Sequence, residues 1–401
     1  MNRVLRIAAI GNQNNNHFSL VRYLRDVGFS IDLLLLCDEQ DHFHPKCDTY
    51  DLAYVDYIKK VHFGAVRGFS RLSSSEINNY FAEYDVLIGT GLAPAILDRA
   101  NRTLDIFDPY GADLWDQTFY RFTSPQLLLD YNLSVFHQRR GIRSSRIIHA
   151  GPMDRRYEDR LMKFSNNERR WFDYMPMVYH PQYEELFNGR HTCTHWQQEF
   201  TQIRKSHDLV IVFAARNNWS SETDQNTKGI DIFIHGYNKF VLNNPGLSCI
   251  AVFTEYGKDV DRAKSEARLL GLHNKVVWLP AMYRKDLMFG LHLADICCGQ
   301  FSISWISNGT LFEALVAGKP ILTWRNPELY GNVDDLYPIY NAKNPNDIAT
   351  CLQEFINNPD RGRKIGLEGQ SWYRDNVVYK TINRYARFFD QRATELGKNV
   401  V

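Results

Sequence analysis

Arg216 and Lys228 are the two residues of this sequence best placed to bind an anion. Arg216 directly follows DLVIVFAA (Asp208–Ala215), which is apolar enough for a buried strand, and Lys228 precedes Gly229, where a helical pattern begins. A helix N-terminus favours negative charge, and a guanidinium with an ammonium can neutralise two linked phosphates. We therefore expect a diphosphate site, with both residues stabilising charge on a departing diphosphate. The alternative is a pair of solvated basic side chains on a polar loop.

A second group of candidate residues opens a later helix. Asn308, Gly309 and Thr310 precede an apolar helical pattern whose first turns contain Glu313. The backbone amides at this helix start are expected to point into the site. A carboxylate would repel a phosphate but suits the hydroxyl groups of a sugar, so we expect Glu313 to bind a ribose.

The first turn of the chain is rich in asparagine where glycines are usual. GNQNNNHF (Gly11–Phe18) follows an apolar strand at Val4–Ile10. Asparagine tolerates left-handed backbone conformations and adds side-chain donors and acceptors. We expect Gly11, Asn15 and Asn16 to bind a sugar or a phosphate, the alternative being a solvated turn.

Apolar runs alternate with amphipathic helices along most of the chain, which is typical of parallel βαβ units. The pattern stops between about residues 153 and 204 and then begins again. Two tandem doubly wound α/β domains that face a cleft are the simplest interpretation. We expect a first domain at 1–185, a second at 186–375 and a C-terminal helix at 376–401.

The composition is that of an ordinary globular protein. The 401 residues are 44% hydrophobic, and 47 basic side chains nearly balance 46 acidic ones, so no overall field draws the chain to nucleic acid. The N-terminal apolar stretch is too short for a signal peptide, and the longest apolar run, Ile31–Cys37, is too short to span a membrane. Seven cysteines without CxxC spacing indicate reduced thiols, so we expect a cytoplasmic protein.

No metal site is predicted. His42–Cys47 and His191–His195 have histidine and cysteine at spacings that a metal could use, but neither has a matched second pair. A structural zinc site needs four ligands.

Four segments together resemble a known family. AARN (Ala214–Asn217), KGID (Lys228–Asp231), VVWLP (Val276–Pro280) and NGTLFEALVAGKPIL (Asn308–Leu322) are similar in order and spacing to the second domain of retaining GT-B glycosyltransferases, of the group 1 or family 4 kind. The resemblance covers about Asp208–Trp324 well and the first domain only in outline.

The resemblance implies roles for several residues. Arg216 and Lys228 would grip the diphosphate of the donor, Glu313 would bind the nucleotide ribose, and Trp278–Met282 would lie beside the nucleobase. The C-terminal helix, at Asp375–Thr394, would cross back onto the first Rossmann-like domain. The family also implies catalysis without a bound metal or a separate cofactor, the nucleotide sugar being a substrate.

The sequence departs from the family at two positions. The first member of the family's Glu-x7-Glu pair falls on Trp305, so the usual carboxylate contact to the donor sugar is missing. DPYGADLW (Asp108–Trp115) resembles the family's His-Gly-x-Asp stretch, with Tyr110 in place of the histidine. A tyrosine can still donate one hydrogen bond, so we expect Tyr110 to take over the catalytic position.

The sequence therefore predicts a glycosyltransferase of polysaccharide biosynthesis. It would move a sugar from a nucleotide-diphosphate donor to a glycan, a lipid-linked molecule or another acceptor, with retention by family analogy. Two alternatives stay open: a sugar-nucleotide epimerase of the same fold, which needs no acceptor, and a non-catalytic sugar-nucleotide-binding protein, which Trp305 and Tyr110 favour. A peripheral membrane contact and the oligomeric state also stay open.

Overall fold

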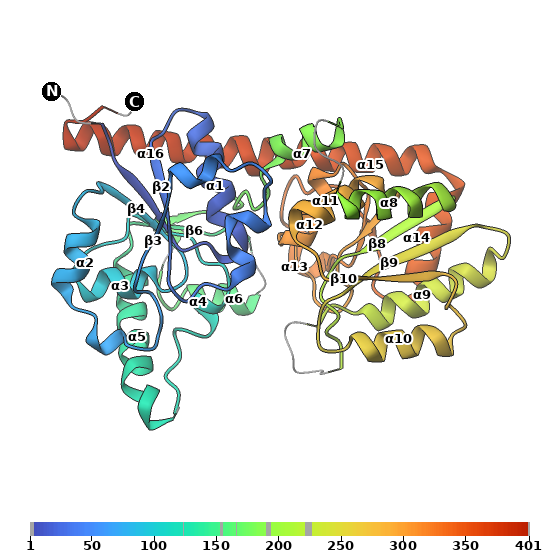
Figure 1. The fold of residues 1–401 in the computed structure, drawn as a ribbon, viewed down its shortest axis with the longest axis horizontal. Helices are drawn as coiled ribbons and strands as arrows, with labels where there is room; N and C mark the ends of the chain where they lie inside the picture. Colours follow the sequence, from blue (N-terminus) through green and yellow to red (C-terminus); the bar gives the residue numbers. More distant parts are fainter. Residues whose placement is uncertain are drawn as a thin grey trace. The chain divides into compact units, whose positions relative to one another are not determined.

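The computed structural model describes residues 4–122, 124–152, 155–165, 167–189, 194–220 and 227–399. Contacts divide the chain into two compact units: unit 1 is Met1–Tyr179 with Asp375–Val401, and unit 2 is His180–Arg374. Each unit contains one parallel sheet with helices around it (Figure 1), which confirms the predicted pair of doubly wound α/β domains.

Unit 1 is built on a seven-stranded sheet in the order β3-β2-β1-β4-β5-β6-β7, in which all neighbours are parallel. The strands are β1 (Ile7–Ile10), β2 (Ile31–Leu35), β3 (Ile58–Lys60), β4 (Val86–Gly89), β5 (Ile106–Phe107), β6 (Ile147–His149) and β7 (Arg170–Trp171). The strand order changes direction between β1 and β4. In open parallel sheets, ligands bind at the carboxyl ends of the strands beside such a switch point.

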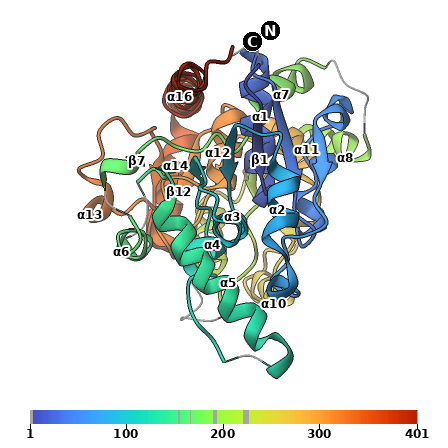
Figure 2. The same ribbon diagram turned by 90° about the vertical axis from the view of Figure 1, so that its left-hand side faces the viewer.

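Helices cover both faces of this sheet. They are α1 (Asn16–Asp26), α2 (Ser74–Phe81), α3 (Ala93–Arg99), α4 (Ala112–Trp115), α5 (Pro125–Ser144), α6 (Arg155–Leu161) and α16 (Lys380–Leu396). Buried residues of α2, α3 and α5 share one apolar cluster with Ala8 and Ile10 of β1. In the turned view of Figure 2, the N-terminal end of α5 extends beyond the other elements of unit 1.

The C-terminal segment is part of unit 1. Helix α16 packs beside α1 (Figure 1), and the Leu5 amide donates to the Asn399 carbonyl at 2.8 Å, so the two ends of the described chain lie side by side. A π-helical stretch at Tyr373–Tyr379 leads into α16.

Unit 2 repeats the architecture with a six-stranded sheet in the order β10-β9-β8-β11-β12-β13, again parallel throughout. The strands are β8 (Leu209–Phe213), β9 (Cys249–Glu255), β10 (Val276–Pro280), β11 (Ile296–Cys298), β12 (Ile321–Thr323) and β13 (Tyr340–Asn341). Its switch point lies between β8 and β11.

The helices of unit 2 begin with α7 (His180–Phe187) and α8 (His195–Ser206). The others are α9 (Ile230–Asn243), α10 (Val260–Leu269), α11 (Arg284–Leu293), α12 (Gly309–Val316), α13 (Pro327–Tyr330), α14 (Pro345–Asn357) and α15 (Pro359–Trp372). Side-chain caps mark several helix starts. Asn344, for example, accepts from the amides of Asn346 and Asp347 at α14, which has proline in its first turn.

The structure places the domain boundary earlier than the sequence suggested. The expected boundary after residue 185 falls inside α7, which belongs to unit 2. The Phe187 ring of this helix stacks on His292 of α11 with 4.1 Å between ring centroids. Phe187 is therefore a packing residue of the second unit.

No helix in the described ranges is long and apolar enough to cross a membrane.

Candidate functional site

Arg216 lies past the carboxyl end of β8, as expected, and is exposed. Its guanidinium donates to the Tyr256 hydroxyl at 2.9 Å and lies 5.0 Å from the centroid of that ring. Tyr256 directly follows β9. The charge of Arg216 is thus held at the carboxyl edge of the sheet.

Lys228 is fixed on the same edge by main-chain contacts. Its amide donates to the Asn218 carbonyl at 2.8 Å, and its own carbonyl accepts from the Phe301 amide at 3.0 Å. Gly229 then adopts a left-handed conformation, with φ of 68°, and α9 begins at the next residue. Lys228 therefore lies beside a helix N-terminus, as predicted, and its ammonium donates to Gln300 Oε1 at 2.8 Å.

The residues that open α12 serve the helix itself. Asn308 is its N-cap, and its side-chain oxygen accepts from the Leu311 amide at 3.0 Å. Gly309 is buried, and Thr310 is half-buried.

Glu313 is buried in an ion pair that the sequence did not reveal. Its Oε1 accepts from Arg284 Nε at 2.7 Å, and the two side chains are 10% and 8% exposed. Arg284 is the first residue of α11, so the pair joins the N-terminal turns of two helices. Any ribose contact of Glu313 would come from a carboxylate already held in place by an arginine.

Trp278 is a packing residue of the sheet. Its indole stacks on Phe253 of β9 with 4.6 Å between ring centroids, and it packs against the apolar core of unit 2. Trp278 is only partly buried, and the contact of Trp278–Met282 with a nucleobase stays a prediction.

In unit 1, Gly11 begins the asparagine-rich turn after β1. It has φ of 82°, and a Cβ atom there would lie 3.0 Å from Thr90 Cγ2 and 3.2 Å from the Thr90 carbonyl oxygen. Gly11 therefore permits the left-handed turn and the close approach of the loops that follow β1 and β4.

The asparagine side chains of this turn mostly bond to the protein. Buried Asn12 accepts from the Phe18 amide at 2.9 Å and donates to Asn15 Oδ1 at 2.9 Å. Asn14 and Asn15 adopt left-handed conformations, with φ of 53° and 59°. Asn15 is 4% exposed and also donates to the His42 carbonyl. The expectation that the Asn15 amide faces a ligand is corrected: it holds the loop together.

Asn16 is the first residue of α1 and is also 4% exposed. Its Oδ1 is buried and accepts no hydrogen bond from the described residues. Unlike Asn15, it therefore keeps an acceptor available beneath the turn.

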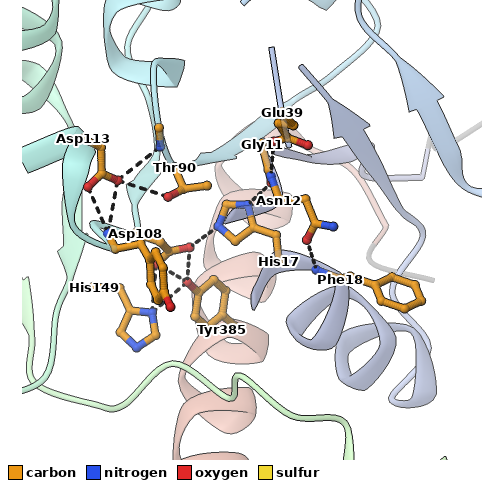
Figure 3. Close-up of polar contacts among 12 residues, drawn as sticks. Gly11, Asn12, His17, Phe18, Glu39, Thr90, Asp108, Asp113, His149 and Tyr385 are labelled. Carbon is orange, nitrogen blue, oxygen red and sulfur yellow. Dashed lines mark hydrogen bonds and ion pairs between the residues drawn. The ribbon is translucent and has the colours of Figure 1, made fainter. Parts of the chain in front are cut away.

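Glu39, which follows β2, contacts the same turn at Asn12. Its Oε1 atom accepts from the Asn12 amide, as Figure 3 shows, and burial raises the pKa of the carboxyl group to about 8, although that hydrogen bond acts in the opposite direction. The carboxyl group is accordingly protonated at neutral pH.

Tyr110 meets the turn from the loop after β5. Its hydroxyl accepts from Asn14 Nδ2 at 2.9 Å, and the residue is 38% exposed. Buried Asp113 fixes the Tyr110 backbone, because its carboxylate accepts from the amides of Tyr110, Gly111 and Gly91. The structure thus brings together two of the predicted segments at the switch point of unit 1.

Asp108 lies beneath these loops at the centre of a buried network (Figure 3). It accepts from His17 Nε2 at 2.9 Å, from His149 Nδ1 at 2.9 Å and from the Tyr385 hydroxyl at 2.9 Å. Burial would raise its pKa, but the hydrogen bonds from both histidines outweigh burial and lower the pKa below the usual range. His17 Nδ1 lies 2.8 Å from the Gly11 carbonyl oxygen, so both ring nitrogens of His17 have an oxygen within hydrogen-bond distance.

Several of these residues were not among the predicted site residues: His17, Glu39, Asp113, His149, Arg284, Gln300 and Tyr385. For His17, His149 and Asp113 a signal was present, because each lies in or near a turn at a predicted strand end, where polar residues converge. For Tyr385 the family resemblance implied only that its helix returns to the first domain, and for Arg284 no signal was present, because it meets Glu313 from a different helix.

Among the described residues, no group of three or more His, Cys, Asp or Glu side chains could hold a metal ion. Of the two stretches considered for a metal, residues 191–193 lie outside the described ranges.

Comparison with known proteins supports the fold. No protein-family model matches the sequence. Over 168 residues, or 40% of this chain, the sequence is 26% identical to the alpha-1,3/1,6-mannosyltransferase ALG2 of Dictyostelium discoideum, and the match spans 36% of that protein.

Two solved structures illustrate the likeness of the folds. Anabaena Alr3699/HepE in complex with UDP and glucose matches with a TM-score of 0.63 and 14% identity, over 96% of this chain and all of that one. The UDP-GlcNAc 2-epimerase of Neisseria meningitidis, bound to UDP-GlcNAc, matches with a TM-score of 0.56 and 12% identity, over 96% of this chain and all of that one. With its two parallel sheets of the same doubly wound type, this chain has the two-domain Rossmann-like GT-B fold of glycosyltransferases.

Proposed function

We propose that this protein is a glycosyltransferase that moves a sugar from a nucleoside-diphosphate donor to an acceptor. The observation that carries the proposal is the position of Lys228: it lies at the N-terminus of α9, beside the switch point of the unit 2 sheet, with Arg216 on the same edge. Two cations and a helix N-terminus at a ligand-binding edge suit a diphosphate.

The proposed chemistry is electrostatic. As the bond between the sugar and the diphosphate breaks, negative charge grows on the departing phosphate oxygens, and Arg216 and Lys228 would stabilise it. This role needs no metal and no separate cofactor. The same proposal includes four further features: retention of the anomeric configuration, a glycan or lipid-linked acceptor, a role in polysaccharide biosynthesis and a cytoplasmic reaction. The six described cysteines are free thiols, which supports the cytoplasmic location.

Substitution of each cation tests the proposal. Arg216→Ala and Lys228→Ala are each expected to lower the rate of transfer or of donor hydrolysis by about 10²-fold or more. Lys364→Ala is the matched control, because the Lys364 side chain on α15 is 76% exposed and pairs only loosely with Glu368. Wild-type rates in both site variants would refute the proposal.

A sugar-nucleotide epimerase is the second candidate, because an enzyme of that kind shares the fold. Incubation with a donor alone distinguishes the two: an epimerised donor supports the epimerase, and a requirement for an acceptor supports transfer. Donor binding without turnover across a panel of donors and acceptors would instead indicate a binding protein.

A further inference from the structure

Gln300 lies at the switch point of the unit 2 sheet, just past the carboxyl end of β11. Its backbone is fixed to the neighbouring strand: its amide donates to Thr323 Oγ1 at 3.1 Å, and its carbonyl accepts from the Trp324 amide at 2.9 Å. The residue is 2% exposed. Gln300 is therefore held rigidly at the position where doubly wound sheets bind ligands.

The direction of the Gln300 side-chain amide is set by Lys228. The Lys228 ammonium donates to Gln300 Oε1 at 2.8 Å, and an ammonium can only donate, so the amide oxygen must face it. The hydrogen bond from the Phe301 amide to the Lys228 carbonyl joins the two main chains beside this contact. This main-chain hydrogen bond therefore fixes the separation at which the side chains of Lys228 and Gln300 meet.

The NH2 group of this amide has no acceptor among the described residues. Gln300 Nε2 is buried and makes no hydrogen bond with any part of the chain that the structure describes. Buried donors are nearly always satisfied, so an orphaned NH2 group at a ligand-binding edge points to an acceptor from outside the chain.

We propose that Gln300 Nε2 and Lys228 Nζ together bind one oxygen of the donor diphosphate. This inference rests on the proposed function and deepens it. The two nitrogens are neighbours, since Oε1 and Nε2 share one carbon atom, and both can only donate. A phosphate oxygen is anionic, accepts several hydrogen bonds and is favoured beside the N-terminus of α9.

The choice of an amide at position 300 has an electrostatic reason. A glutamate there would also accept from Lys228, but its charge would cancel that of the ammonium and repel a phosphate. The neutral glutamine positions Lys228 and, unlike a glutamate, does not itself neutralise the ammonium charge. Gln300 is thus both a positioning residue for Lys228 and a donor to the ligand.

Two variants separate these contributions. Gln300→Glu keeps an acceptor for Lys228 but loses the NH2 group and adds a negative charge, whereas Gln300→Met keeps the shape and loses both hydrogen-bonding groups. Gln353→Met is the matched control, because Gln353 lies on α14 and bonds to Asn244 and Asn357. Far-UV circular dichroism and urea unfolding of each variant establish that it is folded.

The probes are UDP, GDP, ADP and CDP, together with the nucleoside of whichever diphosphate the wild-type protein binds most tightly, measured by isothermal titration calorimetry. We expect Gln300→Glu to weaken diphosphate binding by about tenfold to 100-fold and Gln300→Met by about tenfold, because hydrogen bonds to charged groups have effects of this size. Affinity for the nucleoside and all affinities of Gln353→Met should stay at the wild-type level.

The results distinguish failure of this inference from failure of the proposed function. If Lys228→Ala loses diphosphate binding while both folded Gln300 variants keep wild-type affinity, the inference is wrong and the proposed function stands. If Gln300 variants weaken nucleoside and diphosphate binding equally, Gln300 has only a structural role, and the inference is again wrong. If the wild-type protein binds none of the four diphosphates, the proposed function fails and the inference falls with it.

Discussion

The Tyr385 hydroxyl donates a hydrogen bond of 2.9 Å to the carboxylate of Asp108, a residue 277 positions earlier in the chain. Tyr385 belongs to α16, and Asp108 follows β5, so a buried polar contact joins the C-terminal helix to the carboxyl edge of the unit 1 sheet. Asp108 also holds His17 and His149. The C-terminal helix is thus tied to the same carboxylate that contacts the start of α1 and the end of β6.

Tyr385→Phe is therefore expected to destabilise unit 1. The change removes only a buried hydroxyl that bonds to a charged group, which costs about 2 kcal/mol in the free energy of unfolding. Urea unfolding measures this cost. Tyr379→Phe is the control, because Tyr379 is 55% exposed, and it should lie within about 0.5 kcal/mol of the wild-type protein. Equal stabilities of the two variants would show that the hydrogen bond from Tyr385 to Asp108 adds nothing to the stability of the fold.

Asn15→Ala is expected to destabilise the protein more than Asn15→Gly does. Both changes remove the hydrogen bonds with Asn12 and His42, but only alanine must also adopt the left-handed conformation, which costs about 1 kcal/mol more than for glycine. Differential scanning calorimetry of the two variants measures the difference. If alanine proved as stable as glycine, the backbone at Asn15 would not be left-handed in solution.

The same turn shows how far the sequence could predict the site. The sequence pattern located the strand, the turn and the left-handed tendency of Asn14 and Asn15, because these depend on neighbouring residues. It did not show that the Asn15 amide bonds inside the protein. That depends on His42, which comes from an irregular segment 27 residues later and has no hydrophobic period to place it.

Unit 2 shows the same division between local and distant information. The strand before Arg216 and the helix after Lys228 were predictable because apolar periodicity is strong there. The contact of Lys228 with Gln300 was not predictable. Gln300 lies 72 residues later in a short polar segment, and no sequence pattern links the two residues. The pair between Arg284 and Glu313 was missed because it joins two different helices. Charged residues at helix starts are common, and the sequence does not say which of them meet.

Glu39→Gln is expected to change how stability depends on pH. Burial raises the pKa of Glu39 from its ordinary value of 4.5 to about 8. Between these values the folded protein keeps a proton that the unfolded chain has lost, so this group makes stability fall as the pH rises. Glutamine keeps the acceptor for the Asn12 amide without a titrating proton. Urea unfolding should therefore show similar stabilities at pH 5 and a more stable Glu39→Gln variant at pH 8.5; a wild-type advantage at pH 8.5 would contradict the raised pKa.

The ion pair between Arg284 and Glu313 predicts that a double variant of these residues is more stable than one of the single variants. Arg284→Met would leave a carboxylate buried without its partner, which costs about 3–5 kcal/mol. Glu313→Gln keeps an acceptor for Arg284 Nε and should cost less. The double variant removes the orphaned charge, so it should be more stable than Arg284→Met alone, even though it carries one more substitution.

Urea unfolding of the wild-type protein, the two single variants and the double variant gives the coupling energy between Arg284 and Glu313. Nucleoside binding by Glu313→Gln then separates the role of the carboxylate in the ion pair from a role in ribose binding. If Glu313 also binds a ribose, Glu313→Gln weakens nucleoside affinity although the variant stays folded. Additive losses of stability would show that Arg284 and Glu313 are not coupled in the folded protein. In that case the carboxylate would be free to turn toward a ligand without first leaving an arginine.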